Sequence, residues 1–509
     1  MKHYVFFIGG TGARVLTSFL HICASGMVRM DDTVRLMMLD ADTENGACRN
    51  AMGLYRIYHT NYTRFHSPEI TKALGKDTSQ AFYTDLELPD NVVTPVNTKT
   101  ATLDLATADR GGKKALEWFY TKEEREQNLS RGFYAHPNIG CIYFQDLDKK
   151  LSDYTRQIRD AVSKGEDTRV VIVGSMFGGT GAAGTPSVLK LIQRACLDGG
   201  LTKEQIRQRL HFCGVLVTPY FKVVDVLDKK DSFGGGNIHI NSNTFFNNTQ
   251  AALNYYGFRF AEDFENIYLV GQNGLQLVNS DYVDGGREQE NKPHVVELIA
   301  AMSVKNFLQQ TERGDGALQV YSQILDVEAK KPIFGWDTLD PDLGYVADML
   351  RTQALLKVTF GPYADKPRGL GRPTWYQAFR MNQAGRKEEL SFLMQYTDIF
   401  LNWLYNIQYQ LTEDGHSAAK RDNRIALVSP LIGELGTNSD LRQDVLYAGF
   451  PDLLDDSMDP PPQNISYRYT NAKQIVVNVG ALAASDRVIT ELGSLGLYIE
   501  LLKLSSQRV

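Results

Sequence analysis

A glycine-rich segment about a third of the way along the chain constrains the fold more than any other feature of the sequence. It occupies residues 174–186 as Gly-Ser-Met-Phe-Gly-Gly-Thr-Gly-Ala-Ala-Gly-Thr-Pro and follows the short apolar run Arg169–Val173. Glycine permits positive φ angles and lets bare backbone N–H groups approach an anion. A helix behind such a segment adds unpaired N–H donors and the positive end of its dipole. Because five glycines and two threonines are poor packing material, we interpret this second glycine loop as a phosphate-binding turn.

The first glycine loop lies near the start of the chain. It reads Gly9-Gly10-Thr11-Gly12 and follows the apolar run Tyr4–Ile8. Taken alone, it also fits NAD(P)-binding folds and tight turns that bind nothing. Neither loop is a Walker A motif, because no Gly-Lys-Ser/Thr follows. Since the carboxyl ends of parallel strands meet at one edge of a sheet, we expect both loops to converge on one polyphosphate.

Apolar runs and helical periods alternate along the first three hundred residues, and this alternation predicts an α/β fold with a parallel sheet. The expected strands are Tyr4–Ile8, Val34–Leu39, Arg169–Val173, Leu210–Val217 and Ile267–Val270. The expected helices are Ala13–Ala24, Lys113–Tyr120, Pro186–Cys196, one that follows His294, and Ser391–Leu411. Pro186 is expected in the first turn of its helix, where a missing N–H is tolerated best. Residues 47–105 show no clear period and are expected to mix helix and loop, and residues 279–292 are expected to form a loop.

The bulk composition excludes several classes of protein. The chain has 509 residues, a net charge of −6 and a pI of about 5.9, which does not favour nucleic acid or anionic lipid as a partner. Its five cysteines show no Cys-x-x-Cys spacing, so neither a disulfide framework nor a structural zinc site is expected. Without an apolar stretch long enough to span a bilayer and without a secretory pattern, a cytoplasmic location is expected.

The second glycine loop resembles the signature of the tubulin/FtsZ superfamily, a Gly-Gly-Gly-Thr-Gly-Ser/Thr-Gly run after the fourth strand. Phe177–Ala183 occupies that register, with Phe177 in place of the first glycine and Ala183 in place of the last. The first glycine loop resembles the first phosphate loop of that family, and Asp40-Ala41-Asp42 resembles its acidic second loop. Asp109–Lys114 resembles the third loop, Gln272-Asn273 the sixth, and the helix after His294 the central helix. The resemblance extends over residues 1–360, and Arg14 stands where the family usually has Asn or Gln.

The resemblance implies a Rossmann-like parallel-sheet nucleotide-binding domain over residues 1–291. A long central helix and its connection would follow over 292–333, and a catalytic loop with a second α+β domain over 334–509. It implies GTP or GDP and Mg²⁺ as ligands, with Mg²⁺ held through water by Asp42 or Glu44 and no direct protein ligand. The residues expected to contact the nucleotide are Gly9, Gly10, Thr11, Gly12, Asp40, Asp42, Gly111, Gly112, Ser175, Phe177, Gly178, Gly179, Thr180, Gly181, Gln272, Asn273, His294 and Glu297.

By the same resemblance, the protein would be a GTPase that forms cytoskeletal filaments. Asp337 and Asp340 carry the Asp-x-x-Asp spacing of the family's catalytic loop and would act on the nucleotide of a neighbouring copy. Hydrolysis would therefore require head-to-tail self-association, which builds open filaments.

Each assignment has a simpler alternative. Asp337 and Asp340 also suit an ordinary turn and helix cap, and Asp40 and Asp42 suit a solvated strand end. His294 and Glu297 also suit a surface histidine and an acid at a helix N-terminus. The whole chain could instead be a nucleotide-binding scaffold or switch without hydrolysis. An NAD(P)-dependent oxidoreductase is a third hypothesis, but it predicts a glycine at the position of Val15 and leaves the second glycine loop unexplained.

Overall fold

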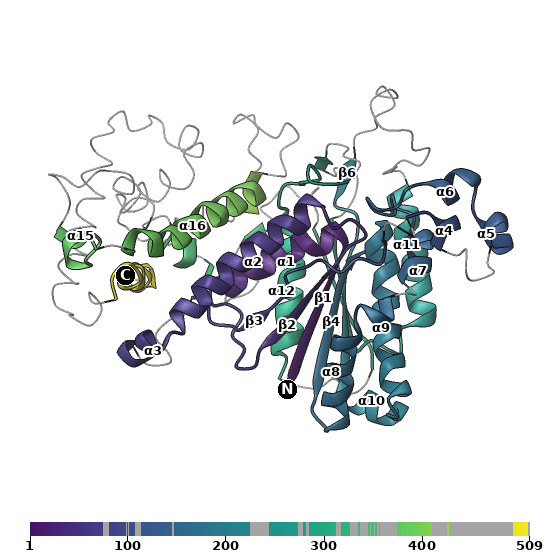
Figure 1. Cartoon of the computed structure of the whole chain (residues 1–509), viewed down its shortest axis with the longest axis horizontal. Helices are drawn as coiled ribbons and strands as arrows, with labels where there is room; N and C mark the ends of the chain where they lie inside the picture. Colours follow the sequence, from purple (N-terminus) through teal and green to yellow (C-terminus); the bar gives the residue numbers. More distant parts are fainter. Residues whose placement is uncertain are drawn as a thin grey trace.

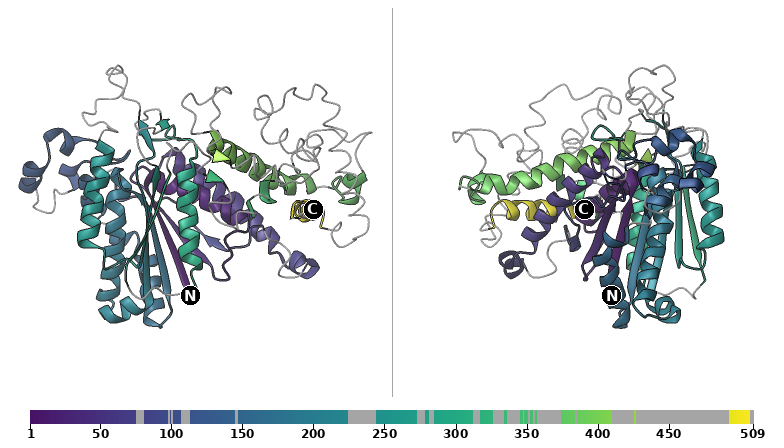
Figure 2. Two further views of the ribbon diagram at one scale, coloured as in Figure 1. Left: turned by 180° about the vertical axis from the view of Figure 1, so that it is seen from behind. Right: turned by 45° about the vertical axis from the view of Figure 1, so that its right-hand side comes forward.

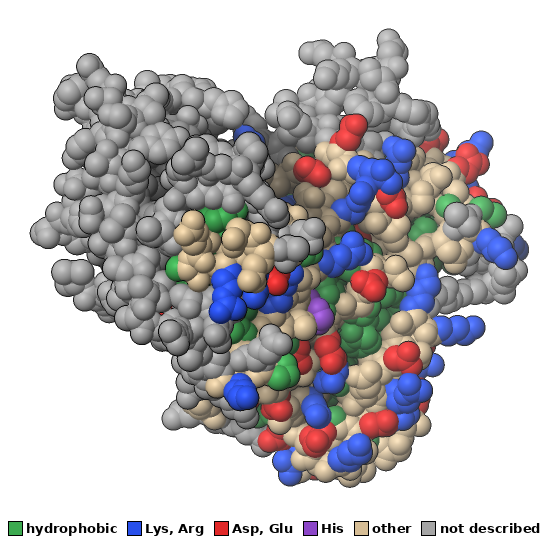
Figure 3. All heavy atoms as spheres, turned by 60° about the vertical axis from the view of Figure 1, so that its left-hand side comes forward, with side chains coloured by type: hydrophobic (Ala, Val, Ile, Leu, Met, Phe, Trp, Pro, Cys, Tyr) green, Lys and Arg blue, Asp and Glu red, His purple; other side chains and the backbone are tan. Residues whose placement is uncertain are grey.

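A computed structural model of the chain gives its fold. It describes residues 1–74, 81–97, 99, 101–106, 113–144, 147–223, 244–272, 278–280, 285–311, 317–325, 334–335, 345–346, 348–350, 352–353, 356, 374–383, 385–409, 425–426 and 492–506. No helix in these parts of the chain is both long and apolar enough to cross a membrane. On the face shown in Figure 3, basic and acidic side chains are interspersed rather than gathered by sign.

Seven parallel strands form one central sheet (Figure 1). In spatial order they are β3 (Leu86–Glu87), β2 (Val34–Leu39), β1 (Lys2–Ile8), β4 (Thr168–Ser175), β5 (Leu210–Val217), β7 (Asn266–Gln272) and β9 (Gln319–Leu325). The chain runs from β1 to β2 and β3 on one side and from β4 onward on the other. The order therefore changes direction between β1 and β4, which is where open α/β sheets bind ligands. The predicted α/β class with a parallel sheet is confirmed.

Helices cover both faces of the sheet, because its strands alternate apolar side chains between two cores. In β1, Val5 and Phe7 belong to one hydrophobic cluster, and Tyr4, Phe6 and Ile8 belong to the other. Burial on both faces is the usual state of a parallel sheet. The first cluster is covered by α1 (Gly9–Ala24), α2 (Gly46–Phe65) and α12 (Val295–Gln309). The second is covered by α7 (Pro137–Phe144), α8 (Ser152–Ser163), α9 (Gly179–Asp198), α10 (Lys203–Arg209) and α11 (Phe245–Arg259).

Shorter elements complete the described chain. They are α3 (Pro68–Leu74), α4 (Leu103–Ala106), α5 (Lys113–Phe119), α6 (Lys122–Glu126), a 3-10 turn (Leu147–Lys149), and the pairs β6 (Phe221–Val223) with β8 (Val278–Ser280) and β10 (Phe334–Gly335) with β11 (Ile425–Ala426). Toward the carboxyl end lie α15 (Thr374–Ala378), α16 (Arg386–Tyr409) and α22 (Ser494–Ser506).

The helix α16 packs beside α2, and both views in Figure 2 show it, in green, alongside the purple helices from the start of the chain. The Trp403 ring stacks on His21 of α1 with centroids 4.4 Å apart, and its Nε1 donates to Ser18 Oγ at 3.3 Å. Side chains of α16 and α22 belong to the same hydrophobic cluster as α1. The described helices after residue 334 therefore share a core with one face of the sheet.

Some helices are longer than the sequence predicted. The helix α1 begins at Gly9 rather than at Ala13. The stretch 47–105, expected to mix helix and loop, contains nearly all of the 20-residue helix α2. The helix α9 begins at Gly179, so Pro186 lies inside it rather than in its first turn. A proline at that position leaves the carbonyl four residues earlier without its helical donor. The Tyr256 hydroxyl of α11 donates to this carbonyl, Ala182 O, at 2.6 Å.

Candidate functional site

The two glycine loops meet at the carboxyl edge of the sheet. The strands β1 and β4 are neighbours, and Ile8 pairs with Gly174 at their ends. Gly9 has a φ of +74°, and a Cβ built on it would lie 3.4 Å from both the Gly181 nitrogen and the Thr180 Cβ. The N-termini of α1 and α9 are thus in contact at the point where the strand order changes direction.

Both helix ends leave their first N–H groups without side-chain caps. The N-cap of α1 is Ile8 and that of α9 is Gly178, and neither makes a side-chain cap bond. Neither helix has an acidic residue in its first turn. The first N–H groups of a helix have no partner within it, and the helix dipole makes that end positive. Two such ends side by side favour an anion.

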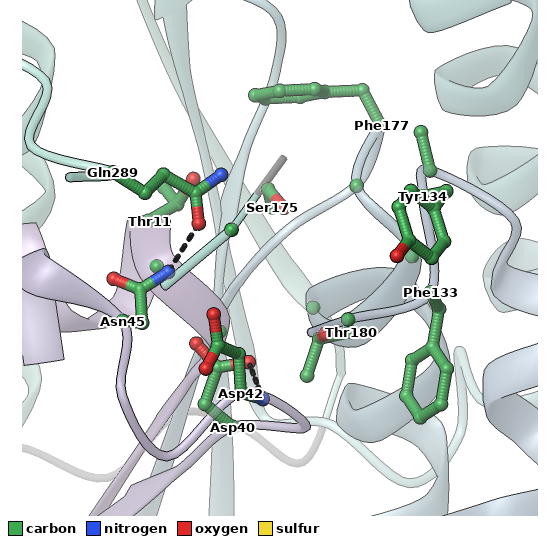
Figure 4. A pocket seen from close by; sticks show the side chains of 18 of the residues that line it. Thr11, Asp40, Asp42, Asn45, Phe133, Tyr134, Ser175, Phe177, Thr180 and Gln289 are labelled. Carbon is green, nitrogen blue, oxygen red and sulfur yellow. Dashed lines mark hydrogen bonds between the residues drawn. The ribbon is translucent and has the colours of Figure 1, made fainter. Parts of the chain in front are cut away.

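A pocket of about 960 Å³, counted with its part open to solvent, lies in front of these helix ends (Figure 4). Both glycine loops line it, together with Asp40, Asp42 and Asn45 from the segment after β2. Phe177, Phe221 and Phe245 supply aromatic surface. The rest of the wall comes from Arg14, residues 131–135, Val223, Gly285, Gln289 and Asn291.

Packing, rather than conformational freedom, explains several of the glycines. A Cβ on Gly12 would lie 2.8 Å from the Phe7 carbonyl carbon, and one on Gly181 would lie 2.6 Å from the Ser175 nitrogen. A Cβ on Gly184 would lie 2.6 Å from Ile8 Cγ2. The expectation that these glycines are poor packing material is therefore wrong for Gly181 and Gly184, which let α9 approach the strands.

Gly10 is different, because the protein leaves room beside it. A Cβ built there would meet only ordinary contacts, with Asn45 Nδ2 at 3.4 Å and Arg14 Nη1 at 3.6 Å. Gly10 lines the pocket. Its lack of a side chain keeps the space in front of α1 open.

The acidic segment after β2 is buried, which contradicts a solvated strand end. Asp40 is 3% exposed and Asp42 is 4% exposed. Asp42 accepts backbone N–H bonds from Gly286 at 2.5 Å and from Glu44 at 3.0 Å. Burial raises the pKa of Asp40 to about 7. The hydrogen bonds that it accepts from Asp42 N–H and the Cys48 thiol lower the pKa but do not offset the effect of burial. Asp40 is therefore poised to change charge near neutral pH.

Two further segments of the wall were not singled out by the sequence. In the first, Tyr134 and Ala135 adopt positive φ angles of 47° and 60°, and Phe133 lies against Gly179. Asn248 of α11 holds this segment by donating from Nδ2 to Ala135 O at 3.0 Å and to Phe177 O at 3.3 Å. Because Asn248 is 113 positions from Ala135, no local sequence pattern reveals this bond.

The second segment, residues 285–291, lies in the stretch expected to form a loop and crosses to the start of α2. Gly46 N–H donates to Gly286 O at 3.1 Å, and Asn45 Nδ2 donates to Gln289 Oε1 at 2.5 Å (Figure 4). Arg287 pairs with the exposed Glu44 at 3.1 Å. These bonds fasten the segment to the acidic residues after β2.

His294 and Glu297 do not line the pocket, in contrast to the expectation that they contact a base. Each is 1% exposed. They form a capping box at the start of α12, in which His294 Nδ1 accepts from Val296 N–H at 3.1 Å and Glu297 accepts from His294 N–H at 2.9 Å. Burial lowers the pKa of His294 to about 3, so its ring is neutral. The helix-cap alternative describes Glu297, whereas His294 is buried and not at the surface.

The remaining expected site residues divide into two groups. Gln272 is the last residue of β7, is buried, and does not line the pocket. Gly111, Gly112, Asn273, Asp337 and Asp340 lie outside the described residues. Among the residues that the structure does describe, no group of three or more His, Cys, Asp or Glu is arranged to hold a metal ion.

The arrangement suits an anion with several charged groups. Bare N–H donors from two helices face one pocket, two arginines and two aspartates line it, and aromatic rings form one wall. No family model matches the chain, and no curated protein is significantly similar to it.

Proposed function

We propose that the chain is a tubulin/FtsZ-like protein that binds GTP in this pocket and hydrolyses it on head-to-tail self-assembly. The observation that carries the proposal is the contact between Gly9 and Gly181, which joins two uncapped helix N-termini at the reversal of strand order. Helix N-termini at such positions bind phosphates in many α/β proteins. The family assignment itself rests on the sequence motifs of the two loops.

The pocket residues fit a nucleoside triphosphate. Backbone N–H groups of residues 10–12 and 179–181 would donate to phosphate oxygens. Phe177, Phe221 and Phe245 offer apolar aromatic surface on which a base could pack. Both Asp42 oxygens already accept N–H bonds, so a water-mediated role toward Mg²⁺ suits this carboxylate better than direct ligation. When bound, Mg²⁺ supplies neutralisation of the phosphate charge.

In this proposal, hydrolysis depends on Asp337 and Asp340. Phosphoryl transfer depends mainly on charge neutralisation and on a positioned nucleophile. In a head-to-tail contact, these carboxylates of one copy would orient water at the pocket of the next. Such a contact is heterologous and continues into a filament.

Two other functions remain in competition, each with an observation in its favour. A nucleotide-binding scaffold or switch without hydrolysis is favoured by Phe177, whose ring packs in an aromatic cluster where the resembled family has glycine. An NAD-dependent oxidoreductase is favoured by the strand order and by Asp40 at the end of β2. The second glycine loop lines the same pocket. It favours a polyphosphate ligand over the two simpler interpretations of the first loop, an NAD(P)-binding loop and a tight turn that binds nothing.

Calorimetric titration of the protein with GTP and with NAD, in the presence of Mg²⁺, tests the binding step. Gly10→Ala adds a methyl group to the open space before α1 and is expected to weaken GTP binding at least about tenfold. Its melting temperature should stay close to that of the wild type, since the methyl group makes only ordinary contacts. Gly53→Ala is the matched control, because a Cβ there meets nothing within 4 Å and Gly53 does not line the pocket. Tight binding of NAD and none of GTP would reverse the assignment.

Light scattering and phosphate release in GTP and Mg²⁺ test the assembly step. We expect turnover that rises with protein concentration, and Asp340→Ala should abolish this turnover while nucleotide binding persists. GTP binding without scattering or turnover in the wild type would support the scaffold or switch.

A further inference from the structure

Within the first turns of α1 and α9, Arg14 is the one residue whose side chain brings a positive charge to the pocket. It lies on α1 and lines the pocket, and its side chain is 10% exposed. A buried guanidinium is costly unless it is paired, because its charge has left water. Its N–H groups therefore need acceptors, either in the protein or in a ligand.

Most of the guanidinium is held by protein groups. Nε donates to Glu297 Oε1 at 2.7 Å, and Nη2 donates to the Tyr220 hydroxyl at 2.8 Å and to Thr11 Oγ1 at 3.1 Å. The Tyr220 hydroxyl in turn donates to Glu297 Oε1 at 2.6 Å. The Phe221 ring also lies near the guanidinium, with its centroid 5.5 Å from the guanidinium carbon.

The remaining nitrogen, Nη1, faces the space in front of the first glycine loop. Within the described parts of the chain it makes no hydrogen bond, and it lies 3.6 Å from the point where a Cβ on Gly10 would be. It therefore offers two N–H donors beside the bare N-terminus of α1. Because Thr11 Oγ1 accepts from Arg14, the proton of the Thr11 hydroxyl is also left for a ligand.

We propose that Arg14 binds a phosphate group of the nucleotide through Nη1, as a positive charge built into the protein where the resembled family has a neutral amide. The inference rests on the proposed function and adds to it a residue that selects for phosphate. A guanidinium is always charged and carries donors only, so it matches phosphate oxygens and rejects other donors. Affinity should then rise with the number of phosphates on the ligand, and part of it should survive without Mg²⁺.

The test removes both charges of the buried pair together. Removing Arg14 or Glu297 alone would leave the other charge buried without its partner, which is strongly destabilising. We therefore compare the wild type with Arg14→Gln/Glu297→Gln by calorimetric titration with GTP, GDP, GMP and guanosine, in Mg²⁺ and in EDTA; Glu297 does not line the pocket. Relative to the wild type, the double variant should bind GTP roughly 10- to 100-fold more weakly, since hydrogen bonds to charged groups have this strength. Guanosine affinity should differ by less than about twofold.

The outcomes separate the inference from the proposed function. Equal losses for guanosine and GTP would show that Arg14 only shapes the pocket, and no loss for GTP would show that it touches no phosphate. Either result overturns the inference while GTP binding by the wild type stands. A wild type that binds no nucleotide would overturn both.

Circular dichroism and thermal unfolding check that each variant folds. If the double variant does not fold, Arg14→Lys replaces it, because lysine keeps the charge balance with Glu297. It should weaken GTP binding more than guanosine binding, and an equal effect on both would again count against the inference.

Discussion

Gly10 and Gly181 look alike in the sequence but serve different purposes in the fold. A methyl group on Gly181 would meet the Ser175 backbone, whereas one on Gly10 would enter the pocket. The sequence places both in turns between strands and helices, yet it does not separate glycines needed for close packing from those that keep a space open. This distinction depends on which atoms of distant residues lie opposite each glycine.

Asp40 should make the stability of the protein depend on pH. Its pKa in the folded protein, raised to about 7 by burial, lies above the ordinary value of 3.8. Between about pH 4 and pH 7 the unfolded chain has released this proton and the folded chain still holds it, so stability falls as pH rises through this window. Above about pH 7 the loss is complete.

Asp40→Asn removes this titration, so we expect the variant to be more stable than the wild type at pH 8. The gain should be on the order of 2–4 kcal/mol and should shrink toward pH 5. Urea unfolding at the two pH values measures it. Asp90→Asn, on the exposed surface, should change stability by less than about 0.5 kcal/mol. A gain of equal size at both pH values would contradict the account.

Among the elements, the sequence predicted five of the seven strands of the central sheet, missed the two edge strands β3 and β9, and predicted the walls of the pocket poorly. Val34–Leu39 and Leu210–Val217 have the bounds expected of them, because strands buried on both faces appear as uninterrupted apolar runs. The helix α2 escaped notice because its buried face is built from residues such as Ala51, Tyr55 and Tyr58, which mark no strong apolar period. The N-cap Asn45 was the signal that could have revealed it.

Residues 131–135 depend on α11 to hold their place at the pocket. Asn248→Ala removes both hydrogen bonds that Nδ2 makes to this segment and to Phe177 O. We expect faster amide hydrogen exchange at residues 131–136 and GTP binding weakened by about 1–2 kcal/mol, the usual effect of losing such bonds. Asn247→Ala, at the exposed neighbouring position, is the control. Unchanged exchange in the Asn248 variant would mean that other contacts hold the segment.

At the scale of the whole molecule, the helices near the carboxyl end are joined to the sheet by a common hydrophobic cluster. Trp403 is almost fully buried and contacts both His21 and Ser18 of α1. The sequence predicted the long apolar helix α16 but not its partner, because the apolar period identifies a buried face without saying what covers it.

Trp403→Ala should lower the free energy of unfolding by about 3–5 kcal/mol, since it leaves a large cavity between α16 and α1. Trp118, which is 82% exposed, provides the matched control, and Trp118→Ala should have an effect below about 0.5 kcal/mol. Urea unfolding followed by circular dichroism measures both. Similar small effects for the two substitutions would show that α16 contributes little to the stability of the sheet.

The bond from Tyr256 to Ala182 O has a consequence for synthesis on the ribosome. Pro186 deprives that carbonyl of its helical donor, and the replacement comes from a residue 74 positions further along. The same helix carries Asn248, which fastens the pocket wall. A nascent chain that has emerged only as far as α10 therefore has both glycine loops but lacks the donor to Ala182 O and the bonds from Asn248. We expect the walls of the ligand site to be complete only after α11 and residues 285–291 have left the exit tunnel and docked.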